Sequence, residues 1–193
     1  INKIFLKNFR NFKNCELSFN NKCNILFGNN GSGKTNILES ISLLCKGRGF
    51  RNAKIKNLIH KNEKNFLIES IFSKDNNKYN IKVYPTFTEN KYKKILSLND
   101  EISKEANEFL ENSLSNLLFL PEMERLFIAS PNYRRNFIDK LIFSEKKNYN
   151  SLINRYKKNL LERSKILQSY EYDEDWLKVI ESNIATSGIE IYN

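Results

Sequence analysis

The sequence predicts an α/β fold in which a strand, a glycine-rich loop and a helix are followed by an inserted antiparallel β meander and the beginning of a helical lobe. Three observations support this prediction. A glycine-rich run at residues 28–35 stands between an apolar stretch and a segment with helical spacing. Several β-rich runs occupy residues 66–98, and the pattern from residue 130 onward is mostly helical.

The N-terminal segment is predicted to form three short strands. Ile4 to Phe9 is expected to be a strand, and Glu16 to Phe19 is its expected hairpin partner after an Asn-rich turn. The apolar stretch Cys23 to Phe27 comes directly before the glycine-rich run and predicts a short buried strand.

The glycine-rich run matches the phosphate-binding loop pattern G-x-x-x-x-G-K-[ST] at every required position. The residues of this loop are Gly28, Asn29, Asn30, Gly31, Ser32, Gly33, Lys34 and Thr35. A helix is predicted from about Gly33 to Cys45, and Gly47-Arg48-Gly49 ends it.

The residue types of the loop suit a nucleotide polyphosphate. Its glycines let successive backbone N–H groups turn inward, and the positive end of the following helix faces the same anion. Lys34 is expected to reach the β- and γ-phosphates, while the Thr35 hydroxyl is expected to ligate Mg²⁺. Nucleotide binding is therefore the firmest function that the sequence predicts.

The segment after the loop helix predicts an antiparallel meander. Residues 50–64 are polar and are expected to be irregular or a short helix; three β-rich runs then follow at Phe66 to Phe72, Tyr79 to Tyr84 and Tyr92 to Leu98. A meander at this place argues against a small nucleotide kinase, whose strands and helices alternate steadily.

The rest of the chain is expected to be mostly helical. Residues 103–112 favour a helix, and Leu117 to Leu120 is expected to be a buried strand that Pro121 stops. Ser130-Pro131 is typical of a helix start, with a serine cap and proline at the first helical position. We therefore expect the nucleotide-binding lobe in residues 1–129 and a helical lobe in residues 130–193.

Charge and cysteine content narrow the class of protein. The net charge of +10 favours an acidic partner such as nucleic acid. Residues 130–170 hold ten Lys or Arg against three Asp or Glu, which fits either a DNA-facing surface or a helix packed beside an acidic neighbour. Three cysteines without a C-x-x-C spacing argue against a zinc site, and we expect a cytoplasmic protein without a membrane span.

Several local strings together resemble one family, the RecF family of bacterial recombination mediators. The strings are Asn8-Phe9-Arg10-Asn11-Phe12, the loop continued through Gly33 to Ile41, Gly47-Arg48-Gly49-Phe50-Arg51, Phe119-Leu120-Pro121-Glu122, and Ser130 to Asp139. The resemblance extends in order over essentially the whole chain, and the first and last of these strings are its most specific parts.

The resemblance implies an ATP-binding head of the ABC and SMC type. Such heads hold ATP and Mg²⁺ between two subunits, so a full-length protein is expected to form an ATP-dependent homodimer. By matching position, Gly28 to Thr35 hold the phosphates and Arg10 lies near the nucleotide. The expected partners are single-stranded, gapped or junction DNA together with RecR and RecO, in recombinational repair and replication restart.

Two parts of such an ATPase are not found in the sequence. These are an acidic pair after a second apolar strand and a signature loop beginning Leu-Ser. The nearest candidate for the acidic pair is Leu117 to Glu122, which has proline where the metal-binding aspartate is expected. No catalytic residue is therefore assigned, and residues 1–193 alone are expected to bind nucleotide without hydrolysing it. The alternatives are another P-loop NTPase, such as a small GTPase or a kinase, and a non-catalytic SMC-like head.

Overall fold

The computed structural model describes residues 1–121, 128, 130–146, 148–169 and 173–192. The chain divides into two compact units, Ile1–Leu118 and Phe119–Asn193, and each is described by itself. The predicted division between residues 129 and 130 into two lobes stays a prediction.

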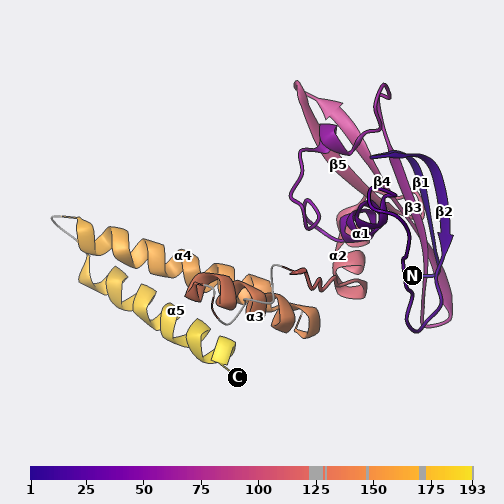
Figure 1. The fold of residues 1–193 in the computed structure, drawn as a ribbon. Coiled ribbons are helices and arrows are strands. Elements are labelled where there is room, and N and C mark those ends of the chain that lie inside the picture. Colours follow the sequence, from indigo (N-terminus) through magenta and orange to yellow (C-terminus); the bar gives the residue numbers. More distant parts are fainter. Residues whose placement is uncertain (122–127, 129, 147, 170–172, 193) are drawn as a thin grey trace. The chain divides into compact units, whose positions relative to one another are not determined.

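A five-stranded antiparallel sheet forms the centre of the first unit (Figure 1). Its strands are β1 (Lys3–Phe9), β2 (Phe12–Ser18), β3 (Leu67–Lys74), β4 (Asn77–Thr88) and β5 (Lys91–Leu98), in the order β2-β1-β3-β4-β5. The predicted hairpin and meander are both confirmed. Pairing of β1 with β3 joins them into one sheet, which periodicity along the chain does not reveal.

The hydrophobic core lies between one face of this sheet and the helices α1 (Lys34–Leu43) and α2 (Lys104–Ser113). Ile68 and Phe72 of β3 alternate inward, and Leu43 of α1 and Leu110 of α2 pack against the same cluster. The helix α2 begins at a serine cap, because the Ser103 hydroxyl accepts a hydrogen bond from the backbone N–H of Ala106 at 3.0 Å. A short 3₁₀ helix, η1 (Ile55–Leu58), lies in the segment expected to be irregular or helical.

Two of the predicted strands are wrong. Residues 23–27 and 117–120 form no strand, and several of their large side chains are exposed, with Ile25 80%, Phe27 91% and Phe119 70% accessible. An apolar run becomes a strand only when a neighbouring strand satisfies its backbone groups, and neither run has such a neighbour among the described residues. Cys23, the first residue of the earlier run, is likewise exposed. The Glu122 end of the second run lies outside the described residues.

The described residues of the second unit form the helices α3 (Pro131–Glu145), α4 (Tyr149–Gln168) and α5 (Glu174–Tyr192). Proline is at the start of α3 as predicted, although the Ser130 side chain makes no capping hydrogen bond. Asp173 caps α5 by accepting hydrogen bonds from the backbone N–H groups of Asp175 and Trp176 at 2.9 and 3.0 Å.

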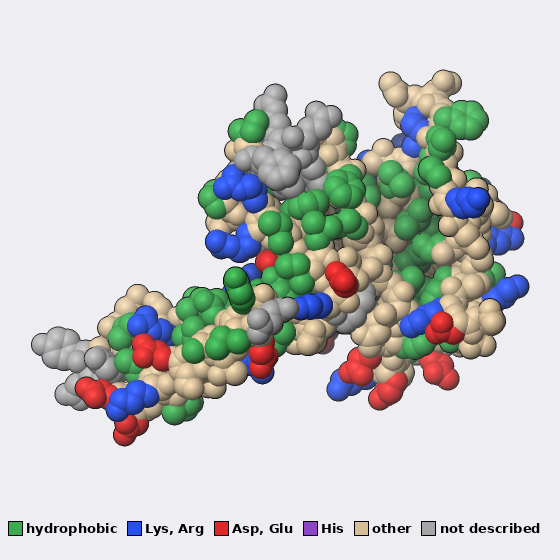
Figure 2. All heavy atoms as spheres, turned by 90° about the horizontal axis from the view of Figure 1, so that it is seen from below, with side chains coloured by type: hydrophobic (Ala, Val, Ile, Leu, Met, Phe, Trp, Pro, Cys, Tyr) green, Lys and Arg blue, Asp and Glu red, His purple; other side chains and the backbone are tan. Residues whose placement is uncertain are grey.

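The helices α4 and α5 run antiparallel and are joined by ion pairs. Arg155 contacts Glu190 at 2.7 Å and Arg163 contacts Glu181 at 2.8 Å. Of the two explanations for the basic segment, an acidic neighbour therefore accounts for these two arginines. Figure 2 shows hydrophobic and charged side chains side by side on the surface of this helical unit. Within the described part of the chain, no helix is both long and apolar enough to cross a membrane.

Candidate phosphate-binding site

The phosphate loop has a backbone that depends on its glycines. Gly28, Gly31 and Gly33 have φ values of 147°, 84° and 104°, in the region that residues with a Cβ rarely adopt. At Gly33 the space is also closed, because a Cβ there would clash with the ring of Phe12 and the side chain of Asn11. The turn between β1 and β2 therefore packs directly on the loop and fixes its approach to α1.

The N-terminus of α1 follows the loop, and no acidic side chain of its first turn neutralises the partial positive charge of the helix dipole there. Gly33 is the N-cap, and its carbonyl accepts the backbone N–H groups of Asn36 and Ile37 at 2.8 and 3.0 Å. No acidic residue lies in the first turn of α1. The first helical N–H groups and the dipole thus favour an anion at this end of the helix.

Lys34 lies over the loop. Its ammonium donates to the carbonyl oxygens of Gly28 and Asn29 at 2.7 and 2.8 Å, which are the first two residues of the motif. These two hydrogen bonds hold the ammonium against the backbone at the start of the loop. The exposed Thr35 is the next residue, at the start of α1.

Arg10 is bound to a buried glutamate. Its Nε and one terminal nitrogen donate to the two carboxylate oxygens of Glu39 at 2.8 and 2.7 Å, in the bidentate geometry that guanidinium favours. Glu39 lies on α1 and is fully buried, and Arg51 also reaches its carboxylate at 3.2 Å. Arg10 is thus held against the helix that begins at the phosphate loop, and its contact with nucleotide stays a prediction.

A chain of amide side chains continues from this cluster to the loop. Arg51 donates to the Asn36 side chain at 2.8 Å, and Asn36 donates to Asn11 at 2.8 Å. Asn11 in turn donates to the carbonyl oxygen of Ser32 at 3.3 Å. Three segments far apart in the sequence therefore brace the loop: the β1–β2 turn, α1, and the residues that follow Gly49.

Sequence reasoning missed Glu39, Asn36 and Asn11 as parts of this site. The signal was present in the strings that carry the family resemblance, because two of them contain Arg10 and Arg51 and the loop string contains Glu39. One buried carboxylate joins all three strings.

The C-terminal end of α1 is also capped from the sheet. The Lys94 ammonium of β5 donates to the carbonyl oxygens of Leu43 and Cys45 at 3.0 and 2.7 Å. A cation is favourable at this end of a helix dipole. Burial of the side chain lowers the pKa of Lys94 from 10.5 to about 8.

The residues at the loop suit a nucleotide with a divalent cation bound to its phosphates. An exposed hydroxyl at the helix start can supply one oxygen ligand to Mg²⁺, with phosphate oxygens and water completing the shell. Among the described residues there is no group of three or more His, Cys, Asp or Glu that could hold a metal ion on its own.

Comparison with known proteins agrees with this geometry. The family described as the RecF/RecN/SMC N terminal domain matches residues 1–122. A DNA replication and repair protein RecF from Rickettsia rickettsii is 37% identical over 194 aligned residues, which cover 100% of this chain and 52% of the relative. The chain belongs to the RecF family.

Other RecF proteins give the same result. RecF from Rickettsia felis is 36% identical over 100% of this chain and 52% of its own length. The chain therefore spans about half the length of the curated relatives it matches.

Two solved structures are similar in fold. One, titled as the recombination mediator protein RecF with ATP in the RecFOR pathway, has a TM-score of 0.73 and 31% identity, covering 99% of this chain and 51% of its own. The other, titled as RecF with ATPrS, has a TM-score of 0.74 and 29% identity, covering 98% of this chain and 51% of its own. The expected α/β fold of the RecF and SMC head type is confirmed, and its sheet is antiparallel throughout.

Proposed function

We propose that this chain is the nucleotide-binding part of an ATP-dependent DNA-binding protein of recombinational repair and replication restart. It binds single-stranded, gapped or junction DNA and assists the loading of a recombinase. The observation that carries the proposal is the complete phosphate loop, with the Lys34 ammonium bound to its first two carbonyl groups and Gly33 packed closely against Phe12. The RecF relatives named above make ATP the favoured nucleotide.

The proposal assigns roles to the residues of the loop. Backbone N–H groups of Gly28 to Thr35 hold the phosphates, Lys34 neutralises the β- and γ-phosphates, and Thr35 ligates Mg²⁺. Arg10 lies near the nucleotide and orients α1 through Glu39. Mg²⁺ supplies charge neutralisation between the phosphates when it is bound.

The proposal extends to the assembled protein. A homodimer closes over two ATP molecules, RecR and RecO are its protein partners, and it acts in the cytoplasm. The nucleotide-binding lobe occupies residues 1–129 and the helical lobe begins at residue 130. The net charge of +10 supports an acidic partner.

Hydrolysis assays with ATP and GTP, with and without gapped DNA, test the proposal on the full-length protein. We expect turnover of ATP only, stimulated by DNA, and loss of DNA binding as salt is raised. A preference for GTP, or transfer of phosphate to a small molecule, would instead favour a GTPase or a kinase and end the proposal.

The variant Lys34→Met should abolish turnover, because the phosphates lose their cation. Lys104→Met is the matched control, since that lysine is 84% exposed on α2 and makes only a 3.7 Å surface pair with Glu108. Equal activity of the two variants would contradict the assigned role of the loop.

A further inference from the structure

The hairpin of β4 and β5 projects beyond the sheet. Pairing of β3 with β4 ends at Ile68 and Val83, whereas β4 and β5 stay paired up to Thr88 and Lys91. Residues 84–95, called the arm below, therefore form a two-stranded ribbon with no third strand beside its outer part. Such a ribbon is only marginally stable by itself in water. The outer part of the arm therefore adds little to the stability of the sheet, and binding is its candidate role.

The arm carries exposed cations and an exposed aromatic ring. Phe87 is 58% accessible, and its ring centroid lies 4.8 Å from that of Tyr92 across the hairpin. Lys91 and Lys93 are exposed on the opposite face, where they pair with Thr88 and Thr86. Lys94 points inward to α1 and is not part of this surface.

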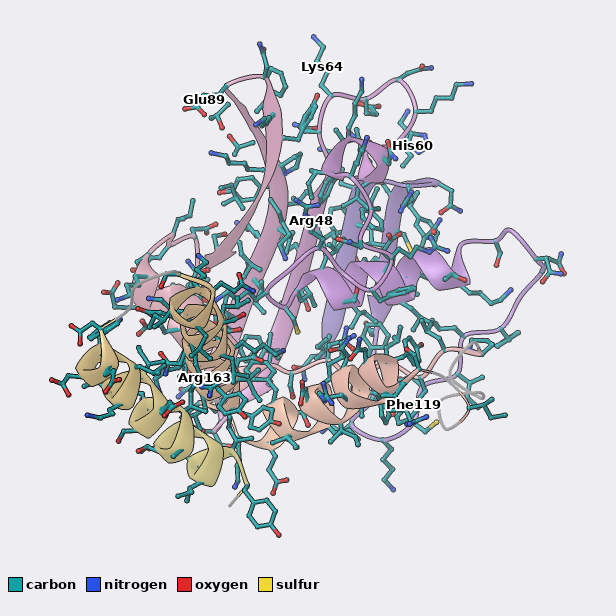
Figure 3. The ribbon with its side chains drawn as sticks, turned by 90° about the vertical axis from the view of Figure 1, so that its left-hand side faces the viewer. Arg48, His60, Lys64, Glu89, Phe119 and Arg163 are labelled. Atoms are coloured by element: carbon teal, nitrogen blue, oxygen red, sulfur yellow. The ribbon has the colours of Figure 1, made fainter. Side chains whose placement is uncertain are left out.

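Further lysines surround the base of the arm. The strand β5 packs beside η1, and Figure 3 places Lys64 and Glu89 at the same end of the sheet. The arm and the segment of residues 54–64 together carry the exposed cations Lys54, Lys56, Lys61, Lys64, Lys91 and Lys93, against the acids Glu63 and Glu89.

The six lysines have no acidic partner. None of them forms an ion pair or a side-chain hydrogen bond within the part of the chain that the structure describes. Toward the opposite end of β4, Lys82 pairs with Asp100 at 2.5 Å, whereas the exposed Lys78 forms no ion pair within the described residues. The arm and the segment beside it are thus distinguished by the number of their exposed lysines and by the exposed ring of Phe87 among them.

We propose that the arm and the adjoining lysines form the surface that binds a single strand of nucleic acid. The proposal rests on the proposed function, and it adds the location and the mode of contact. Lys91 and Lys93 contact phosphates and Phe87 stacks on an unpaired base, the combination by which single strands are bound without sequence preference. Strands of a ribbon are only about 5 Å apart, so one nucleic-acid strand along its edge meets both faces. An acidic protein would satisfy the lysines but gives the protruding ring no base to stack on.

The test is fluorescence anisotropy of a labelled oligothymidylate with the full-length protein and ATP, over a range of salt concentrations. The double variant Lys91→Gln/Lys93→Gln should lower affinity about ten- to thirtyfold near 0.1 M salt and reduce the salt slope by about 1.4. Phe87→Leu, which keeps an apolar contact for Tyr92, should lower affinity about five- to a hundredfold with an unchanged salt slope. The effect of Phe87→Leu should be absent on blunt duplex DNA, whose bases are already stacked.

The control is Lys78→Gln/Lys104→Gln, which removes the same charge from exposed positions at the far end of β4 and on α2 and should bind within about twofold of the unaltered protein. If the arm variants bind like this control while the unaltered protein binds in the presence of ATP, the arm is not the DNA surface and the proposed function survives. If the unaltered protein binds no DNA, both proposals fail. An equal loss from Phe87→Leu on duplex and single strands would overturn the stacking contact.

Discussion

The substitution Glu39→Gln should destabilise the first unit far more than its size suggests. Glu39 is fully buried and accepts three hydrogen bonds from two guanidinium groups, at 2.7, 2.8 and 3.2 Å. Glutamine has nearly the same shape, but it removes the negative charge and turns an N–H₂ group toward a cationic partner. The variant therefore isolates the charge from the packing.

The expected loss in the free energy of unfolding is about 2–4 kcal/mol. Removing one partner of a fully buried ion pair costs about 3–5 kcal/mol, because the remaining charge is left buried. The side chains of Arg10 and Arg51 keep 21% and 37% of their surface exposed, so water recovers part of this cost. We therefore place the expected loss about 1 kcal/mol below the range for a fully buried pair.

Urea unfolding followed by circular dichroism measures this loss, with Glu111→Gln as the control. Glu111 contacts Lys46 at 2.8 Å, but its side chain is 35% exposed and Lys46 is 77% exposed, so its variant should lose less than about 1 kcal/mol. Equal losses for the two variants would refute the reasoning that Glu39 is the buried anchor of the phosphate loop.

Three further predictions concern the loop, the end of its helix and the thiols. Gly33→Ala should lower the free energy of unfolding in urea by about 2–4 kcal/mol. Gly47 has a φ of 102° but no atom within 4 Å of a new Cβ, so Gly47→Ala should lower it by only about 1–2 kcal/mol. Equal losses would contradict the closed space at Gly33. The pKa of Lys94 is lower in the folded than in the unfolded chain, so the unfolded chain binds more protons between about pH 8 and 10 and the stability contributed by Lys94 rises with pH there. The stability of the unaltered protein relative to Lys94→Met should accordingly increase by at most about 1.4 kcal/mol per pH unit in that range, and a pH-independent difference in urea unfolding would contradict this. Finally, Cys23 is exposed while Cys15 and Cys45 are half-buried, and burial raises the pKa of Cys15. Mass spectrometry after brief alkylation should therefore find the label first on Cys23. Faster labelling of Cys15 would contradict this order of exposure.

The sequence predicts those parts of the fold that depend on local signals. The β-rich run at residues 66–72 predicts a strand, and the structure has β3 there, with Ile68 and Phe72 buried. The same holds for the loop helix, where glycines mark both ends. Such signals act within a few residues, so they can be read without knowledge of distant neighbours.

The apolar runs at 23–27 and 117–120 show where this reasoning fails. Hydrophobicity indicates that a segment favours burial, but it does not say which other segment provides the partner. Ile25 and Phe27 therefore satisfy the pattern of a buried strand and are nevertheless exposed. The cluster of Arg10, Glu39 and Arg51 escaped prediction for the same reason, because its members are 29 and 12 residues apart and only the folded chain brings them together.

Calorimetric titration of the full-length protein with ATP and Mg²⁺ tests the central claim most directly. The account predicts a single class of ATP sites in the unaltered protein and in Lys104→Met, and at least a hundredfold weaker binding in Lys34→Met, because several charge-assisted contacts to the phosphates are lost. Unchanged ATP affinity in Lys34→Met would contradict the assignment of residues 28–35 as the phosphate site.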